Sequence, residues 1–140
     1  MRGAARAEAE SAVLLANASF YRAFSEGNAS AMSELWAARA PIACLHPGAP
    51  LLVGRDAVLE SWRAILREGQ AFSLRCSSAT VQLLGDVAVV LCYEGGDGEP
   101  AHLAATNLFV LEEGTWRMVH HHAGPLSSPI AAPSSTALVN

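Results

Sequence analysis

The segment 87–92 is apolar on both sides of a strand, and this pattern most constrains the fold. Successive side chains of a β-strand leave opposite faces of the sheet. Here both sets are apolar: Val87, Val89 and Leu91 on one face, and Ala88, Val90 and Cys92 on the other. A sheet with one solvated face would alternate apolar and polar residues. The sequence therefore predicts a sheet that is covered on both faces.

Helical spacing precedes the strands. Apolar and aromatic residues recur at intervals of three and four within 7–26, and Asn28 is a plausible cap for a shorter second helix. A short strand is expected at 42–46, closed by Pro47-Gly48. Gly54 opens a third predicted helix that runs to about Arg67.

From residue 71 onward the pattern changes to strands joined by turn-forming residues. The expected strands are 71–84, 87–94, 101–111 and 115–122, the last stopped by Gly124-Pro125. Helices followed by an antiparallel meander indicate the α+β class. One predicted face of the sheet is covered by the three helices. We expect a second subunit to cover the other, which makes the chain a homodimer through its sheet.

Composition limits the kinds of partner. The 140 residues suffice for one domain, expected at 1–125, with a flexible Pro/Ser/Ala-rich tail at 126–140. A net charge of −4 argues against nucleic acid as a partner, because phosphates require a basic patch. There is no apolar run of about 20 residues and no signal-peptide pattern, so a cytoplasmic protein without a membrane span is expected. The three cysteines are expected to be buried and reduced.

Several short motifs occur in a characteristic order. They are Phe20-Tyr21-Arg22-Ala23-Phe24 with Trp36, His46-Pro47, Gly54-Arg55-Asp56-Ala57-Val58 leading to Trp62, Gly85-Asp86-Val87-Ala88, and Thr106 with 114–120. In this order the chain resembles the NTF2-like superfamily, also called SnoaL-like or ketosteroid-isomerase-like, over roughly residues 8–125. The nearest branch is similar to the association domain of calcium/calmodulin-dependent protein kinase.

The resemblance implies a cone in which three helices pack on a curved, mostly antiparallel sheet around a cavity. It also implies that the convex face forms a dimer. Three pocket arginines of the kinase domains correspond here to Glu94, Asn107 and Ala123, so none of the three is kept. An anionic ligand held by Arg is therefore not expected. The implied cavity is apolar and suits a small hydrophobic molecule.

The same resemblance assigns the faces of the strands. Cys92 and Glu94, Ala105 and Asn107, and Val119 and His121 are implied to face the cavity. The opposite face is implied to carry His120, His122 and Trp116. Among the three consecutive histidines, only the middle one therefore belongs to the predicted site.

Glu94, Asn107 and His121 form a reasonable acid–base set. An apolar setting raises the pKa of a carboxyl group, a histidine can titrate near neutrality, and an amide can steady an oxyanion. By role, Glu94 is implied to be the proton-transfer base and His121 its partner or the general acid. Two other readings stay open: Glu94 contacts a ligand passively, or it only solvates the end of a strand.

Four further residues are candidate ligand contacts, together with Cys92. His46 lies at the expected cavity mouth, although a capped or surface histidine is the plainer interpretation. Tyr21, Trp36 and Trp62 come from the helices that face the cavity. They are core aromatics first, and in a hollow cone some core residues also line the pocket.

No metal site and no cofactor are expected. His120 and His122 share a face, but a metal needs further ligands, and His102 is the only evident candidate. No phosphate-binding glycine loop, serine nucleophile elbow or Cys-x-x-Cys motif occurs. The expected function is small-molecule binding, with or without cofactor-independent acid–base chemistry of the isomerase, cyclase or dehydratase type. The alternative is a non-catalytic association module that forms homo-oligomers.

Overall fold

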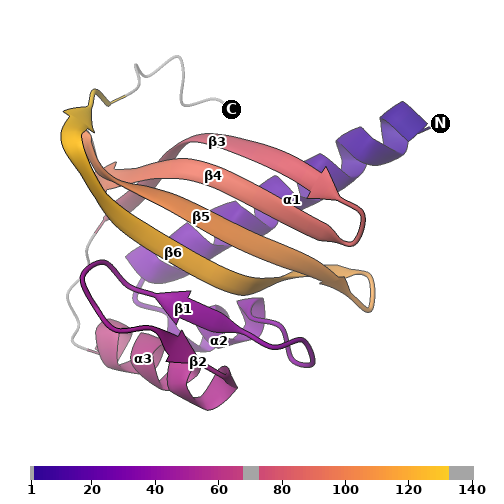
Figure 1. The fold of residues 1–140 in the computed structure, drawn as a ribbon, viewed down its shortest axis with the longest axis horizontal. Coiled ribbons are helices and arrows are strands. Elements are labelled where there is room, and N and C mark those ends of the chain that lie inside the picture. The colour runs from indigo at the N-terminus through magenta and orange to yellow at the C-terminus, as the bar shows by residue number, and fades with distance from the viewer. Residues whose placement is uncertain (1, 68–72, 133–140) are drawn as a thin grey trace.

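The computed structural model describes residues 2–67 and 73–132. Three helices come first in the chain, interrupted by a short strand pair, and four long strands follow (Figure 1). The helices are α1 (Arg2–Ser25), α2 (Ala29–Leu35) and α3 (Arg55–Arg67). The strands are β1 (Ala43–Leu45), β2 (Leu52–Val53), β3 (Leu74–Leu84), β4 (Val87–Gly96), β5 (Ala101–Glu112) and β6 (Thr115–Ile130).

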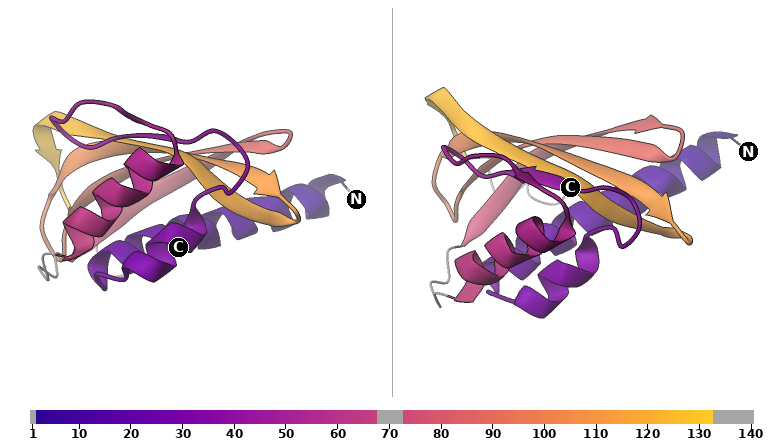
Figure 2. Two further views of the ribbon diagram at one scale, coloured as in Figure 1. Left: turned by 90° about the horizontal axis from the view of Figure 1, so that it is seen from below. Right: turned by 60° about the horizontal axis from the view of Figure 1, so that its bottom comes forward.

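The six strands form one sheet in the order β2-β1-β6-β5-β4-β3. All neighbours are antiparallel except β1 and β6, which are parallel. The three helices lie on one side of this curved sheet, which we call the inner face (Figure 2). The fold is thus the α+β arrangement that the sequence predicted, with helices on a curved and mostly antiparallel sheet.

Local signals in the sequence explain where the helices end. Gly27, two residues after the end of α1, has a positive φ of 63°, a conformation that glycine adopts without steric cost. The Asn28 side chain then accepts a hydrogen bond from the Ala31 amide at 3.0 Å, which caps α2 as predicted. These two residues turn the chain so that α2 packs beside α1.

The core lies between α1 and the inner face. Phe20 of α1, Trp62 of α3 and Phe109 of β5 are all buried, as are Met32 and Met118. Alternate residues of β4 (Ala88, Val90, Cys92 and Glu94) are buried against the helices. The predicted cover on the outer face is a second subunit, and no helix of the described residues lies there.

A β-bulge in β6 corrects one prediction. Leu108 pairs with His120 but Phe109 pairs with Met118, so Val119 is the extra residue. Before the bulge, even-numbered residues face inward. Trp116 therefore packs against the core, and its predicted place on the face of His120 is wrong. Beyond the bulge the predicted parity holds.

The end of β6 is a second correction. Gly124-Pro125 does not stop the strand, which pairs with β5 as far as Ile130. Proline is tolerated there because β1 pairs only with residues 120–122, and the other edge of β6 is open beyond them. The predicted tail at 126–140 is thus strand in its first five residues. Residues 133–140 lie outside the described residues, so flexibility there stays a prediction.

Candidate functional site

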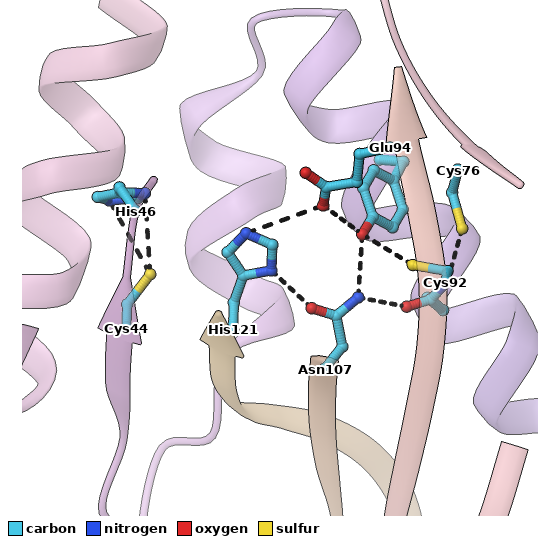
Figure 3. Close-up of polar contacts among 9 residues, drawn as sticks. Cys44, His46, Cys76, Cys92, Glu94, Asn107 and His121 are labelled. Carbon is cyan, nitrogen blue, oxygen red and sulfur yellow. Dashed lines mark hydrogen bonds and ion pairs between the residues drawn. The ribbon is translucent and has the colours of Figure 1, made fainter. Parts of the chain in front are cut away.

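Five polar residues from four elements meet beneath α1, and we call them the polar centre. Asn17 and Tyr21 come from α1, Glu94 from β4, Asn107 from β5 and His121 from β6 (Figure 3). All five are buried, with 0–5% of each residue exposed. The register explains the meeting, because Asn107 pairs directly with His121, and Glu94 projects from the same face of the neighbouring strand.

Hydrogen bonds within the polar centre fix the tautomer of His121. The Asn107 amide nitrogen donates to Asn17 Oδ1 at 2.8 Å and to the Tyr21 hydroxyl at 3.1 Å. The other end of this amide is its oxygen, which can only accept. His121 Nδ1 lies 2.6 Å from that oxygen and therefore carries a hydrogen. In neutral His121 the lone pair is then on Nε2.

Nε2 of His121 faces Glu94. The Tyr21 hydroxyl donates to Glu94 Oε2 at 2.6 Å, and His121 Nε2 lies 3.9 Å from the same oxygen. That separation exceeds a direct hydrogen bond. A carboxyl oxygen and an imidazole lone pair thus approach each other without being bonded, and each keeps capacity to exchange a proton.

Burial sets the charge state of this pair. It raises the pKa of the Glu94 carboxyl, and the hydrogen bond from Tyr21 opposes that effect in part. Burial, and then the other nearby histidines, lower the pKa of His121 to about 3. The imidazole of His121 is therefore uncharged at neutral pH, so its contact with Glu94 is not an ion pair, and burial shifts Glu94 toward its uncharged form. Burial also raises the pKa of Tyr21, which stays a hydroxyl donor.

Aromatic rings occupy the space beside His121. The ring centroids of Phe20 and Trp62 lie 4.9 and 5.9 Å from that of the imidazole. Trp62 also meets His46 edge-on, with centroids 4.8 Å apart. Aromatic side chains therefore form much of the apolar surroundings of the His121 imidazole.

His46 belongs to a separate hydrogen bond. Its Nε2 lies 2.7 Å from the Ser61 hydroxyl of α3, and burial lowers the pKa of the half-buried imidazole. Among the described residues it makes no hydrogen bond to Glu94 or His121, and its link to the polar centre is the ring of Trp62. The hydrogen bond to Ser61 links the residue after β1 to α3. A contact between His46 and a ligand stays a prediction.

The predicted site residues are thus brought together in part. Tyr21, Glu94, Asn107 and His121 share one hydrogen-bonded cluster, and Cys92 joins it through a 3.3 Å contact of its sulfur with the Tyr21 hydroxyl. Trp36 is buried in the core, and no hydrogen bond links it to the cluster. The indole nitrogens of Trp36 and Trp62 are both buried without a partner.

Asn17 is the member that sequence analysis missed. It lies four residues after Val13 and four before Tyr21, on the face of α1 that is otherwise buried and apolar. A buried amide requires a partner, because an unpaired one costs about 1–3 kcal/mol. A lone asparagine in an apolar helical stripe was therefore the available signal.

A hollow of about 610 Å3 lies against the sheet. The outer-face residues that line it include Thr80, Leu91, Tyr93, Thr106 and His122, and its lining contains no Asp, Glu or Arg. The predicted apolar cavity around Glu94 and His121 stays a prediction. In residues 2–67 and 73–132 we find no group of three or more His, Cys, Asp or Glu that could hold a metal ion. Within the same residues, no helix combines the length and the apolar character needed to cross a bilayer.

Comparison with known proteins supports the fold and the resemblance. A family model for the SnoaL-like domain matches residues 13–130. A structure from Streptomyces avermitilis, named as a candidate dehydratase of the NTF2-like family, is 31% identical with a TM-score of 0.79. The match covers 88% of this chain and 99% of that chain.

Two further relatives extend the comparison. A structure from Thiobacillus denitrificans, named as a candidate calcium/calmodulin-dependent protein kinase type II association domain, is 33% identical with a TM-score of 0.70. That match covers 80% of this chain and 93% of the other. The F-box protein SKIP8 of Arabidopsis thaliana is 30% identical over 114 residues, which is 80% of this chain. The chain spans about half of the length of SKIP8, since 48% of that protein is covered.

Proposed function

Because this chain belongs to the SnoaL-like domain family, we propose that it binds a small, mostly hydrophobic molecule beside the polar centre and moves a proton on it. One observation carries the proposal. His121 Nε2 and Glu94 Oε2 lie 3.9 Å apart, both side chains are buried, and both favour their uncharged forms. An uncharged acid beside an uncharged base is the pair that acid–base catalysis requires.

Elimination of water is the reaction that fits this pair best. Nε2 of His121 takes a proton from a carbon atom of the ligand, and the Glu94 carboxyl gives its proton to the departing hydroxyl group, which leaves as water. His121 is then an imidazolium and Glu94 a carboxylate. Transfer of the proton between them restores the starting state. The Streptomyces avermitilis relative, named as a candidate dehydratase, supports this reaction class.

The remaining members of the polar centre have supporting roles in this scheme. The Tyr21 hydroxyl donates to Glu94 Oε2 and stabilises the carboxylate that forms. Asn107 accepts from His121 Nδ1–H, which aims Nε2 at the reacting atom and stabilises the imidazolium. Asn17 in turn holds the Asn107 amide in its orientation.

The test is dehydration of β-hydroxy ketones. Loss of water gives a conjugated enone, whose ultraviolet absorbance is followed with time. Glu94→Gln and His121→Phe should each lower the rate by at least about 100-fold, because each removes one of the two proton-transfer groups. Thr106→Ala, on the outer face next to Asn107, is the matched control and should retain activity. An unchanged rate in Glu94→Gln would reject Glu94 as the acid.

A second function is favoured by the outer face. No helix of the described residues covers it, and the lining of its hollow contains no Asp, Glu or Arg. The 33% identity to a candidate kinase association domain adds support. We therefore propose a homodimer through the outer face, in which self-association is either the whole function or accompanies ligand binding. Light scattering that finds a single 14.7 kDa species at micromolar concentration would refute the dimer.

A further inference from the structure

Two cysteines lie side by side at the edge of the polar centre. Cys76 of β3 pairs in register with Glu94 of β4, and Cys92 projects from the same face two residues before Glu94. Each of the two side chains is the largest influence on the pKa of the other, as their places on one face of neighbouring strands allow. Cys76 and Cys92 are both drawn in Figure 3 beside the polar centre. We call them the dithiol pair.

The two residues of the dithiol pair differ in how exposed they are. Cys92 is 5% exposed, whereas Cys76 is half-buried and lines a surface cavity of about 90 Å3. Arg75 and the hairpin loop 95–99 form much of the rest of that cavity. Cys92 also borders the outer-face hollow of about 610 Å3, but because it is only 5% exposed a small reagent has readier access to Cys76.

Hydrogen bonds distinguish the two thiols further. The Asn17 amide nitrogen donates to Cys76 Sγ at 3.5 Å. The Cys92 thiol donates instead to the Tyr21 hydroxyl at 3.3 Å, because the hydrogen of that hydroxyl is donated to Glu94. The nearby Cys92 side chain is the main influence that lowers the pKa of Cys76, whereas the pKa of Cys92 is raised. A thiolate is the reactive form of cysteine. Cys76 thus has the features of an attacking sulfur, and Cys92 those of a thiol that reacts second.

We propose that Cys76 and Cys92 are a modification site for hydroperoxides, which convert the dithiol pair into a disulfide. The Cys76 thiolate attacks the peroxide, forming an S–O bond and breaking the O–O bond, and the released alkoxide or hydroxide leaves with a proton. Cys92 then attacks the sulfur of the Cys76 sulfenic acid. The S–S bond forms, and the S–O bond breaks with loss of water. Two thiols are oxidised by two electrons, and one peroxide is reduced.

The backbone next to Cys76 can accommodate the new bond. A disulfide needs its sulfurs at about 2.05 Å, so the two side chains must close up. The register of β3 is irregular between Ser77 and Thr80, directly after Cys76. Ser78 there has a φ of 56°, which is an uncommon conformation for this residue type. A strand that is already irregular adjusts more readily than a regular ladder.

Oxidation would also reach the polar centre. Cys92 Sγ lies 3.3 Å from the Tyr21 hydroxyl, and Cys76 accepts from Asn17. A disulfide removes the thiol hydrogens and redirects both contacts. The dithiol pair therefore couples the redox state of the solvent to the hydrogen bonds of Tyr21. This inference goes beyond the proposed proton transfer and does not depend on it.

Peptide mapping after treatment with hydrogen peroxide tests the proposal. Trypsin places Cys76 and Cys92 together on fragment 76–117 and Cys44 alone on fragment 40–55. Fragment 76–117 should lose about 2 Da, the mass of two hydrogens, and should regain it with dithiothreitol. Cys44 is the internal control, because it is fully buried and burial raises its pKa to about 12. It should react at least about 100-fold more slowly than Cys76.

Two serine variants separate the roles of the sulfurs. Cys92→Ser should stop at a sulfenic acid on Cys76, which dimedone traps. Cys76→Ser should consume peroxide at least about 100-fold more slowly than the wild type. Circular dichroism of both variants checks that they fold.

Three outcomes would overturn the proposal. They are oxidation of Cys44 as fast as that of Cys76, wild-type reactivity in Cys76→Ser, and a wild-type product in which Cys76 is oxidised without the loss of about 2 Da. A disulfide that joins two chains would likewise count against the internal pair.

Discussion

The inner and outer faces of the sheet are built from the same strands but hold polar groups differently. On the inner face, His121 is 4% exposed, is bonded to Asn107, and has its pKa lowered to about 3. One residue away on the outer face, His122 is exposed and lies over a hollow. The strand is the same, and only the side from which the side chain leaves is different. Whether helices cover a face of the sheet, and not the position of a residue in the sequence, therefore determines the burial and the pKa of a histidine in this strand.

The two faces also differ in how firmly their polar groups are fixed. Every member of the polar centre has a hydrogen-bond partner within the cluster, because water cannot replace a lost one beneath α1. The polar residues of the outer hollow, such as Thr106 and His122, face space that water or another chain can fill. Substitutions should therefore be costly on the inner face and mild on the outer one.

Asn107 and Thr106 provide the strongest test of this contrast, since they are neighbours on opposite faces. Asn107→Ala should lower the free energy of unfolding by about 3 kcal/mol or more, because three hydrogen bonds are lost and their partners stay buried. Thr106→Ala should change it by less than about 1 kcal/mol. Urea unfolding at neutral pH measures both. Equal losses would show that the faces do not differ in this way.

The dependence of stability on pH should show the uncharged pair of the inner face. Below pH 6.5 the unfolded chain binds a proton that folded His121 does not, so stability falls with falling pH until about pH 3. Glu94 acts in the opposite sense. Its raised pKa gives stability that is complete below pH 4.5 and is lost as pH rises through its folded value. Between pH 4.5 and 6.5, falling pH therefore lowers the stability through His121 and raises it through Glu94.

Variants separate these two contributions. Between pH 4.5 and 3.5, His121→Phe should remove a decline of about 1.4 kcal/mol that the wild type shows. Glu94→Gln should retain that loss of stability between pH 4.5 and 3.5. It should lack the loss of stability that the wild type shows as pH rises through the folded-state pKa of Glu94. Urea unfolding across this pH range is the measurement. A His121→Phe protein whose acid-side slope matches the wild type would mean that His121 is charged in the folded state.

The smallest effect on stability is expected from a charge placed on the outer face. Leu91→Arg should change the free energy of unfolding of the protomer by about 0.5 kcal/mol or less, because Leu91 is 40% exposed. It should nevertheless convert the proposed dimer to a monomer, because like charges would meet across a two-fold interface. Light scattering follows the change. Leu15→Arg, at an α1 residue that is 70% exposed, is the matched control and should leave the dimer intact.

Strand alternation, combined with the resemblance to the NTF2-like superfamily, was sufficient to place much of the candidate site from the sequence. It put Glu94, Asn107 and His121 on one face, and that face is the one the helices cover. The cap at Asn28 depends on local sequence, and it was predicted. Their roles in a reaction stay predictions, because burial and distance do not by themselves show turnover.

What the sequence could not reveal depends on partners that are distant in the chain. The bulge at Val119 arises from the pairing of β5 with β6, so Trp116 was assigned to the wrong face. Gly124-Pro125 was read as a stop, although an open strand edge tolerates proline there. The bond between Asn17 and Asn107 spans 90 residues of sequence, and no local pattern contains it.

The extra residue in β6 gives the strand a tolerance to one change in length. Met118 and His120 already pair with the adjacent residues Phe109 and Leu108, so deleting the codon for Val119 would restore unbroken alternation without exchanging the two faces. His121 would still lie beneath α1, and His120 and His122 would still face outward. At other positions of a strand a missing residue reverses every side chain beyond it, whereas here the strand can lose one residue and keep both faces.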